Sequence, residues 1–131
     1  MNSSSNIYVA VVDDDESYCR STARLLRTSG MQPITYSSAE AFLADKKRPD
    51  FDCLFLDIRL GGMSGIELSR RLLHLGSKTP VVFNTAHDQP TLRDEALQTG
   101  CAAYLRKSDS GETALSAIRN AIQSNARGNT Q

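Results

Sequence analysis

Short apolar runs alternate with segments of helical periodicity along most of the chain. The run at residues 51–56 is apolar at nearly every position, which is typical of a strand covered by helices on both faces of a parallel sheet. Comparable runs come before and after it, and the run at 31–36 is the weakest. The pattern predicts five strands, at residues 7–12, 31–36, 51–56, 80–84 and 101–105.

Between these runs, apolar residues recur three or four positions apart, as they do along one face of a helix. The expected helices carry ordinary start and stop signals. Ser38 and Ser64 suit helix starts, and Gly30, Gly76 and Gly100 suit helix ends. Five β/α repeats with short connections favour a doubly wound, open parallel α/β sheet.

The expected domain occupies residues 7–125. Asp109 and Glu112 have the spacing of a capping box and predict Asp109 as the cap of the last helix. We expect residues 1–6 to form a disordered N-terminal tail. The polar residues 126–131 predict a C-terminal tail or the start of a linker.

Composition excludes several function classes. The 131 residues, of which 40% are apolar, suit one globular domain with a real core. Fifteen basic residues balance fifteen acidic ones, so no net charge draws the chain to nucleic acid or an anionic membrane. No apolar run approaches the ~20 residues of a spanning helix, and residues 1–6 lack a signal-peptide pattern. We therefore expect a cytoplasmic protein that binds neither membranes nor nucleic acid directly.

Three cysteines, Cys19, Cys53 and Cys101, lie far apart in the sequence. A zinc site formed with His74 and His87 is conceivable, but the close ligand pairs of such sites are missing. Buried, reduced thiols are the better interpretation.

The most informative polar residues stand where the predicted strands end. The first strand runs into Asp13 and Asp14, the third into Asp57, the fourth into Thr85, and the fifth toward Lys107. In an open parallel sheet, ligands bind outside the carboxyl ends of the strands, where the strand order reverses. If the first, third and fourth strands are neighbours, these side chains meet in one crevice.

Such a crevice predicts phosphoryl chemistry. Clustered carboxylates repel one another unless a cation lies among them, and Mg²⁺ prefers oxygen ligands. A carboxylate can also attack phosphorus, and an ammonium and a hydroxyl group can then hold the phosphoryl oxygens. Each residue alone has an ordinary explanation. An Asp after a strand is usually a helix cap, and we expect Asp15 to be a cap or simply solvated. A lone lysine is usually solvated. The ordered combination favours the site.

These residues give the chain a resemblance to the receiver domains of two-component response regulators, covering nearly all of residues 7–125. The similar stretches are Val11–Asp15, Leu56–Leu60, Met63–Gly65, Asn84–Ala86 and Tyr104–Lys107. The resemblance implies a flavodoxin-like (βα)5 fold with strand order 2-1-3-4-5. It also implies a switch that takes a phosphoryl group from a sensor histidine kinase or a histidine phosphotransfer protein, and is not an enzyme with turnover.

The resemblance also implies a role for each site residue. Asp57 matches the phosphoacceptor. Asp13 and Asp14 match the acidic pair, which holds Mg²⁺ together with Asp57 and the backbone carbonyl of Arg59. Thr85 and Lys107 match the groups that contact the phosphoryl oxygens, and Tyr104 matches the aromatic switch. That switch belongs to the face of the fourth helix, fifth strand and fifth helix, through which a homodimer is plausible.

The chain departs from the family pattern at three places. Ser108 follows Lys107, where family members commonly have a proline with a cis peptide bond. Because a cis bond costs about 2.5–4 kcal/mol without proline, we expect trans geometry and an altered loop. Gly61 and Gly62 replace a proline-containing segment and predict a looser loop. Arg59 and His87 flank the crevice, where the family resemblance implies an altered lifetime of the phosphoryl group.

Other functions compete with this interpretation. Phosphatases with a nucleophilic Asp use similar chemistry, but they need a second Asp two residues after the nucleophile, and that position is Arg59 here. A phosphorylation-independent interaction module would arise if the switch had decayed at Ser108. A nucleotide-binding function would need a glycine-rich loop after the first strand, and the chain lacks one there. Segments like 38–43 and 63–68 often precede a helix-turn-helix domain, so a DNA-binding output domain outside this chain is compatible with the sequence.

Overall fold

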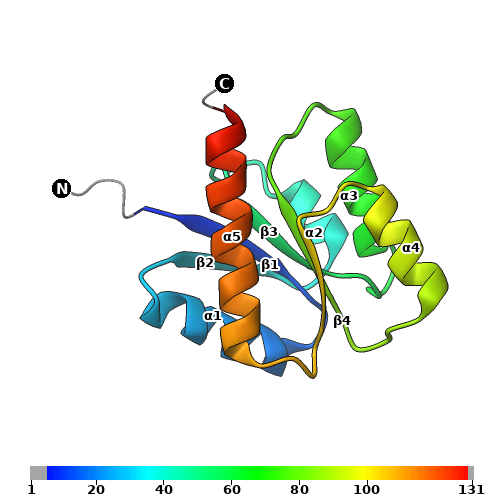
Figure 1. Cartoon of the computed structure of the whole chain (residues 1–131), viewed down its shortest axis with the longest axis horizontal. Coiled ribbons are helices and arrows are strands. Elements are labelled where there is room, and N and C mark those ends of the chain that lie inside the picture. The colour runs from blue at the N-terminus through cyan, green and yellow to red at the C-terminus, as the bar shows by residue number, and fades with distance from the viewer. Residues whose placement is uncertain (1–5, 130–131) are drawn as a thin grey trace.

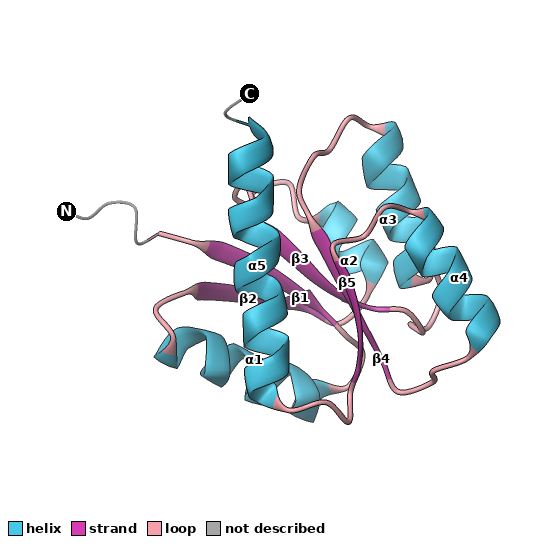
Figure 2. Ribbon diagram, viewed as in Figure 1, coloured by secondary structure: helices cyan, strands magenta, loops and turns pink. Residues whose placement is uncertain are grey.

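The computed structural model of the protein describes residues 6–129, with side chains to residue 126. Five strands alternate with five helices along the chain (Figures 1 and 2). The strands are β1 (Tyr8–Val12), β2 (Gln32–Tyr36), β3 (Cys53–Asp57), β4 (Val81–Thr85) and β5 (Ala103–Arg106). The helices are α1 (Glu16–Thr28), α2 (Ala39–Ala44), α3 (Gly65–His74), α4 (Pro90–Gln98) and α5 (Gly111–Asn129).

All five strands are parallel and form one sheet in the order β2-β1-β3-β4-β5. The predicted fold class and strand order are therefore confirmed. The chain leaves β1 toward β2 at one edge and then crosses to β3 on the other side of β1. The strand order thus reverses between β1 and β3, and the carboxyl ends of these two strands are where ligands bind in such sheets.

Helices cover both faces of the sheet, as the apolar third strand predicted (Figure 1). Along a strand, successive side chains point to opposite faces, so one strand supplies two separate cores. Phe55 packs with residues of α1 and α5, such as Leu26 and Ile118. Leu54 and Leu56 pack with residues of α2, α3 and α4. Both cores fix the tilt of β3, whose residues are all buried.

Most helix starts follow the sequence signals. The side chains of Ser38 and Ser64 accept hydrogen bonds from the backbone N–H groups of Ala41 (3.0 Å) and Glu67 (3.1 Å). Asp15 caps α1 in the same way, as expected, by accepting the N–H of Tyr18. Each side-chain oxygen satisfies one of the backbone donors that a helix start leaves free.

The predicted cap of the last helix was wrong. Ser110, not Asp109, accepts the N–H of Thr113 at 3.1 Å, and its backbone carbonyl accepts the N–H of Ala114. Asp109 instead accepts the backbone N–H of Arg106 at 2.9 Å and closes the turn that leads out of β5. Because the carboxylate of Asp109 binds the turn after β5, the next residue, Ser110, caps the helix instead.

The ends of the chain add two observations. Helix α5 continues to Asn129, so the polar stretch that we expected as a tail from residue 126 begins as helix. Of the expected N-terminal tail at 1–6, residues 1–5 lie outside the described residues. Within the described part, no helix has the length and apolarity needed to cross a membrane.

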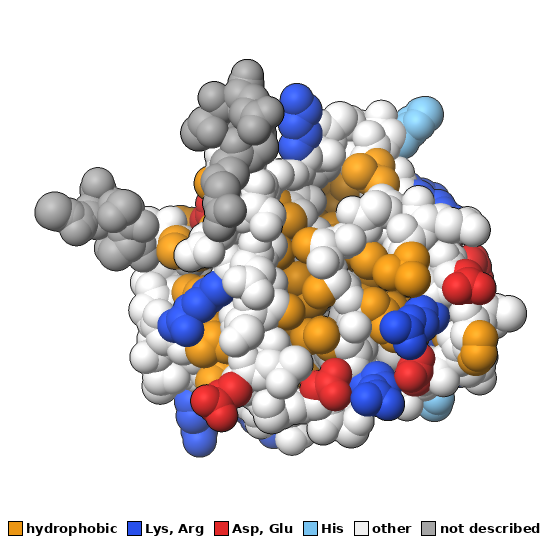
Figure 3. Space-filling view, viewed as in Figure 1, with side chains coloured by type: hydrophobic (Ala, Val, Ile, Leu, Met, Phe, Trp, Pro, Cys, Tyr) orange, Lys and Arg blue, Asp and Glu red, His pale blue; other side chains and the backbone are white. Residues whose placement is uncertain are grey.

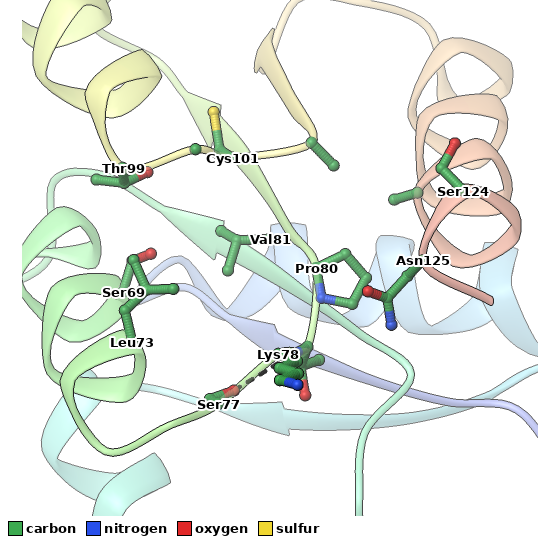
Figure 4. A pocket seen from close by; sticks show the side chains of 14 residues that line it. Ser69, Leu73, Ser77, Lys78, Pro80, Val81, Thr99, Cys101, Ser124 and Asn125 are labelled. Carbon is green, nitrogen blue, oxygen red and sulfur yellow. Dashed lines mark hydrogen bonds between the residues drawn. The ribbon is translucent and has the colours of Figure 1, made fainter. Parts of the chain in front are cut away.

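A pocket of about 320 Å³ opens at the amino end of β4, between α3 and α5 (Figure 4). Pro80 and Val81, at the start of the strand, form its floor, and Ser69 and Asn125 line its sides. It lies at the amino end of the sheet, away from the edge at which parallel sheets bind ligands. It therefore does not coincide with the acidic residues singled out in the sequence.

Candidate functional site

Side-chain alternation decides which polar residues meet at the carboxyl ends of the strands. Phe55 of β3 pairs with Val82 of β4, and both point toward α1 and α5. Two positions further along, Asp57 pairs with Asn84, and these two side chains point to the same face. Asp13 and Lys107 follow β1 and β5 and reach the same place.

Three carboxylates gather there. One oxygen atom of each of Asp13, Asp14 and Asp57 lies within 4.8 Å of the others. Asp13 and Asp57 are buried, at 3% and 5% exposure, whereas Asp14 is exposed. The sequence interpretation that acids from the first and third strands converge is therefore correct in its geometry. Among the described residues, no group of cysteines and histidines is placed to hold a metal ion, and all three thiols are free. Cys19 and Cys53 are buried as predicted, whereas Cys101 is only partly buried.

The ammonium group of Lys107 joins the carboxylates. Its Nζ atom lies 2.8 Å from Oδ2 of Asp13 and 3.2 Å from Oδ2 of Asp57. The backbone N–H of Lys107 donates to the carbonyl of Thr85 at 2.8 Å, so the sheet ladder holds this residue beyond the end of β5. The described chain has no cis peptide bond, and the Lys107–Ser108 bond is trans, as expected. Lys107 reaches the site without a proline after it.

The electrostatics of the cluster are unbalanced. Burial, and then the charge of Asp13, raises the pKa of Asp57 from its ordinary 3.8 to about 6, although Lys107 and the N–H of Arg59 act in the opposite direction. Burial also opposes the charge of Lys107, but Asp13 and Asp57 outweigh it and raise the pKa of this lysine. Three carboxylates beside one ammonium leave excess negative charge, and an oxygen-ligated divalent cation fits that donor set.

The backbone around Asp57 is held closely. The N–H of Arg59 donates to Oδ1 of Asp57 at 3.2 Å, and the N–H of Gly65 donates to the carbonyl of Ile58 at 3.0 Å. A Cβ atom on Gly65 would lie 2.1 Å from the carbonyl oxygen of Asp57. Only glycine therefore lets α3 begin this close to the third strand, and the approach fixes the direction of Asp57.

The loop with two glycines is tied to α2. Glu40 accepts the backbone N–H of Met63 at 2.9 Å, and Gly62 takes a φ of +84°. This hydrogen bond lowers the pKa of Glu40. We had expected a looser loop here. The carboxylate of Glu40, which the sequence interpretation did not consider, supplies an anchor for it.

Thr85 and Tyr104 belong to the other face of the sheet, toward α3 and α4. Thr85 is fully buried, and its hydroxyl oxygen accepts the N–H of His87 at 3.0 Å. Tyr104 is half-buried, and its hydroxyl donates to Asp88 at 3.1 Å. The guanidinium of Arg93 lies 5.7 Å from the centre of the Tyr104 ring. The ring of Tyr104 packs against the core, while its hydroxyl group makes its bond to Asp88 at the surface.

Two further residues at the site had no role in the sequence interpretation. The amide of Asn84 donates a hydrogen bond to the hydroxyl of Tyr18, which comes from the first turn of α1. The ring centre of Tyr18 lies 4.7 Å from Nζ of Lys107. A polar Asn at the end of the buried strand β4 was the available signal, because a buried amide needs a partner.

Comparison with known proteins decides the family. Residues 9–119 match the response regulator receiver domain. The chain belongs to this family. It is thus a phosphoacceptor switch module of two-component signalling and not a classical enzyme, and a histidine kinase is the partner that membership implies.

Relatives of this receiver domain include response regulators of known name. The chain is 33% identical over 115 residues to the response regulator protein TmoT of Ectopseudomonas mendocina and 35% identical over 111 residues to the transcriptional regulatory protein FixJ of Azorhizobium caulinodans. These alignments cover 88% and 85% of this chain but only 52% and 53% of the relatives. The chain therefore spans about half the length of the curated relatives that it matches.

The structure also resembles a solved response regulator, StyR. The two agree with a TM-score of 0.85 at 36% sequence identity, over 95% of this chain and 63% of that one. The receiver part of a longer regulator is thus the shared unit.

Proposed function

We propose that Asp57 accepts a phosphoryl group from a phosphohistidine on a sensor histidine kinase or a phosphotransfer protein. The observation that carries the proposal is the meeting of Asp13, Asp14 and Asp57 with the ammonium of Lys107 at one edge of the sheet. Asp57 is the member of the trio at the end of the central strand β3. Its Oδ1 is fixed by the N–H of Arg59 and its Oδ2 by Lys107.

The transfer is a balanced exchange of bonds. A carboxylate oxygen of Asp57 attacks phosphorus, and an O–P bond forms while the P–N bond of the phosphohistidine breaks. The leaving imidazole nitrogen keeps the bonding electron pair and takes a proton from water. Lys107 stays protonated and compensates the charge on the phosphoryl oxygens, and the hydroxyl of Thr85 donates a hydrogen bond to one of them.

Asp13, Asp14, Asp57 and the backbone carbonyl of Arg59 would hold a Mg²⁺ ion. The donor set fits, because it consists of oxygen atoms and carries more negative charge than Lys107 offsets. The bound ion would neutralise the clustered carboxylates and the phosphoryl oxygens. Arg59 and His87 are exposed beside the site, and we propose that they set how easily water reaches the phosphoryl group.

The signal leaves the site through Thr85 and Tyr104. The phosphoryl group adds about −1.5 to −2 charge and three acceptor oxygens. When Thr85 turns its hydroxyl toward them, it gives up the N–H of His87, and Tyr104 gains room to leave Asp88 and turn inward. The readout then appears on the face formed by α4, β5 and α5.

That face suits a protein partner. Apolar side chains show along the strip between α5 and α4 (Figure 3), and Leu97 of α4 is 52% exposed. We propose that phosphorylation controls contacts there, with a second copy of this chain as one partner. The relatives are about twice as long as the matched region, and one of them is named a transcriptional regulatory protein. Both facts support our proposal of a DNA-binding output domain outside this chain.

Phosphorylation by acetyl phosphate tests the proposal. Intact-mass spectrometry should find one phosphoryl group on the wild type with Mg²⁺, and none with EDTA or on Asp57→Ala. Two further assays separate the rival functions. Mg²⁺-dependent NMR shifts with beryllofluoride should appear in the wild type, whereas a phosphorylation-independent module would show none. Steady turnover of a chromogenic phosphate ester would instead indicate a phosphatase.

A further inference from the structure

We propose that Tyr18, fixed by Asn84, is a positioning residue that keeps the ammonium group of Lys107 between Asp13 and Asp57. The inference rests on the proposed function of Asp57 and deepens it. It assigns to α1 a part in the phosphoryl-transfer site that no residue of the acidic cluster supplies.

Lys107 has to cross from the end of β5 to the carboxylates on a long side chain. A lysine side chain loses much rotamer entropy when it is held in one place, so it needs several contacts to stay there. Two contacts are the carboxylates of Asp13 and Asp57. The third is the ring of Tyr18, whose centre lies 4.7 Å from Nζ. This distance lies within the range of a cation–π interaction.

The ring of Tyr18 is itself fixed at both ends. At its backbone, the N–H of Tyr18 donates to Asp15, the cap of α1, at 3.1 Å. At its far end, the hydroxyl accepts a hydrogen bond from the amide of Asn84. Asn84 is only 2% exposed. The ring therefore has little freedom to leave the lysine.

The position of Asn84 links this support to the phosphoacceptor. Asn84 pairs with Asp57 in the register of β3 and β4, and its side chain points to the same face of the sheet. The residue beside Asp57 thus holds the ring that contacts Lys107. Ser108 leaves the backbone after the lysine without the rigid ring of a proline. The position of the Lys107 ammonium group therefore depends more on side-chain contacts than it would in a chain with a proline after the lysine.

Leucine and phenylalanine substitutions at Tyr18 separate the ring from the hydroxyl group. Tyr18→Leu keeps apolar volume but removes the aromatic face, and we expect its phosphorylation rate with acetyl phosphate and Mg²⁺ to fall about five- to tenfold. Tyr18→Phe keeps the ring but loses the hydrogen bond from Asn84, and it should recover most of the rate, to within about two- to threefold of the wild type, which is the rescue that the positioning role requires. Asn84→Leu removes the same hydrogen bond and should fall in the same range. Tyr8→Leu, at the opposite end of the sheet, is the matched control and should keep the wild-type rate.

An NMR measurement without metal or phosphoryl donor tests the contact separately. The ring current of Tyr18 should shift the ε-methylene protons of Lys107 upfield in the wild type and in Tyr18→Phe, and the shift should vanish in Tyr18→Leu. Loss of this shift together with a slower reaction supports the inference. A folded Tyr18→Leu with the wild-type shift or the wild-type rate overturns it, and so does Asn84→Leu if both values are unchanged. A wild type that takes up no phosphoryl group overturns the proposed function instead, whatever the NMR shift shows.

Discussion

Replacing the phosphoacceptor with its uncharged isostere should make the metal-free protein more stable. Asp57 has a side-chain exposure of 6%, and burial together with Asp13 raises its pKa from 3.8 to about 6. A raised carboxyl pKa means that the folded protein holds the protonated form better than the unfolded chain does. The ionised form therefore costs stability at neutral pH. Asp57→Asn removes that charge and keeps the shape.

The size of the effect follows from the pKa difference. About two pKa units at ~1.36 kcal/mol each give an upper value of about 3 kcal/mol at pH 8. For a domain of 131 residues, 1 kcal/mol corresponds to about 3–4 °C in Tm. The raised pKa already includes the ion pair with Lys107. Because an amide reproduces the protonated carboxyl only approximately, we expect Asp57→Asn to raise Tm by about 4–10 °C.

Urea unfolding in EDTA, followed by circular dichroism between pH 5 and pH 8, measures the difference. Ionised Asp57 destabilises the folded wild type fully above pH 6, and this destabilisation disappears as the pH falls toward 3.8. The extra stability of Asp57→Asn should therefore shrink in acid. Asp50→Asn, at an exposed carboxylate, is the control and should change little. Added Mg²⁺ should stabilise the wild type and narrow the gap. An Asp57→Asn protein no more stable than the wild type at pH 8, or equally stabilised at pH 5, would refute the reasoning.

Three further substitutions test other parts of the structure. Lys107→Met should lower the unfolding free energy in EDTA at pH 8 by about 3 kcal/mol, because it leaves two buried carboxylates without their cation; an unchanged urea midpoint would contradict the ion pairs. Gly65→Ala should cost more than about 2 kcal/mol and slow phosphorylation, because its Cβ would meet the carbonyl of Asp57; wild-type Tm and rate would show that α3 can move away. Ser110→Ala should lower the unfolding free energy in urea by about 1 kcal/mol through loss of the α5 cap, and an unaltered value would contradict the stabilising role of this cap.

The fold and the acidic cluster were accessible from sequence because both depend on simple periodicities. The apolar run before Asp57 identified a central strand, and alternation along β1 and β3 then brought Asp13 and Asp57 to one face. Parallel strands end at the same edge of a sheet, so residue order alone was enough to gather the carboxylates.

The supporting contacts were not accessible, because each depends on distances between elements. Tyr18 and Asn84 are 66 positions apart, and nothing in either segment indicates that they meet. The hydrogen bond that the N–H of Met63 donates to Glu40 likewise depends on how α2 packs beside the loop after β3. The sequence predicted an altered loop after Lys107, but it did not indicate that the backbone N–H of Lys107 donates to the carbonyl of Thr85.

Mapping the phosphorylated residue tests the central claim most directly. After incubation with acetyl phosphate and Mg²⁺, borohydride reduces an aspartyl phosphate to homoserine, and peptide mass spectrometry locates the converted residue. Conversion at position 57 alone, absent in EDTA, is the result that phosphoryl acceptance by Asp57 predicts. Homoserine at Asp13 or Asp14, or no conversion in a folded protein, would contradict it.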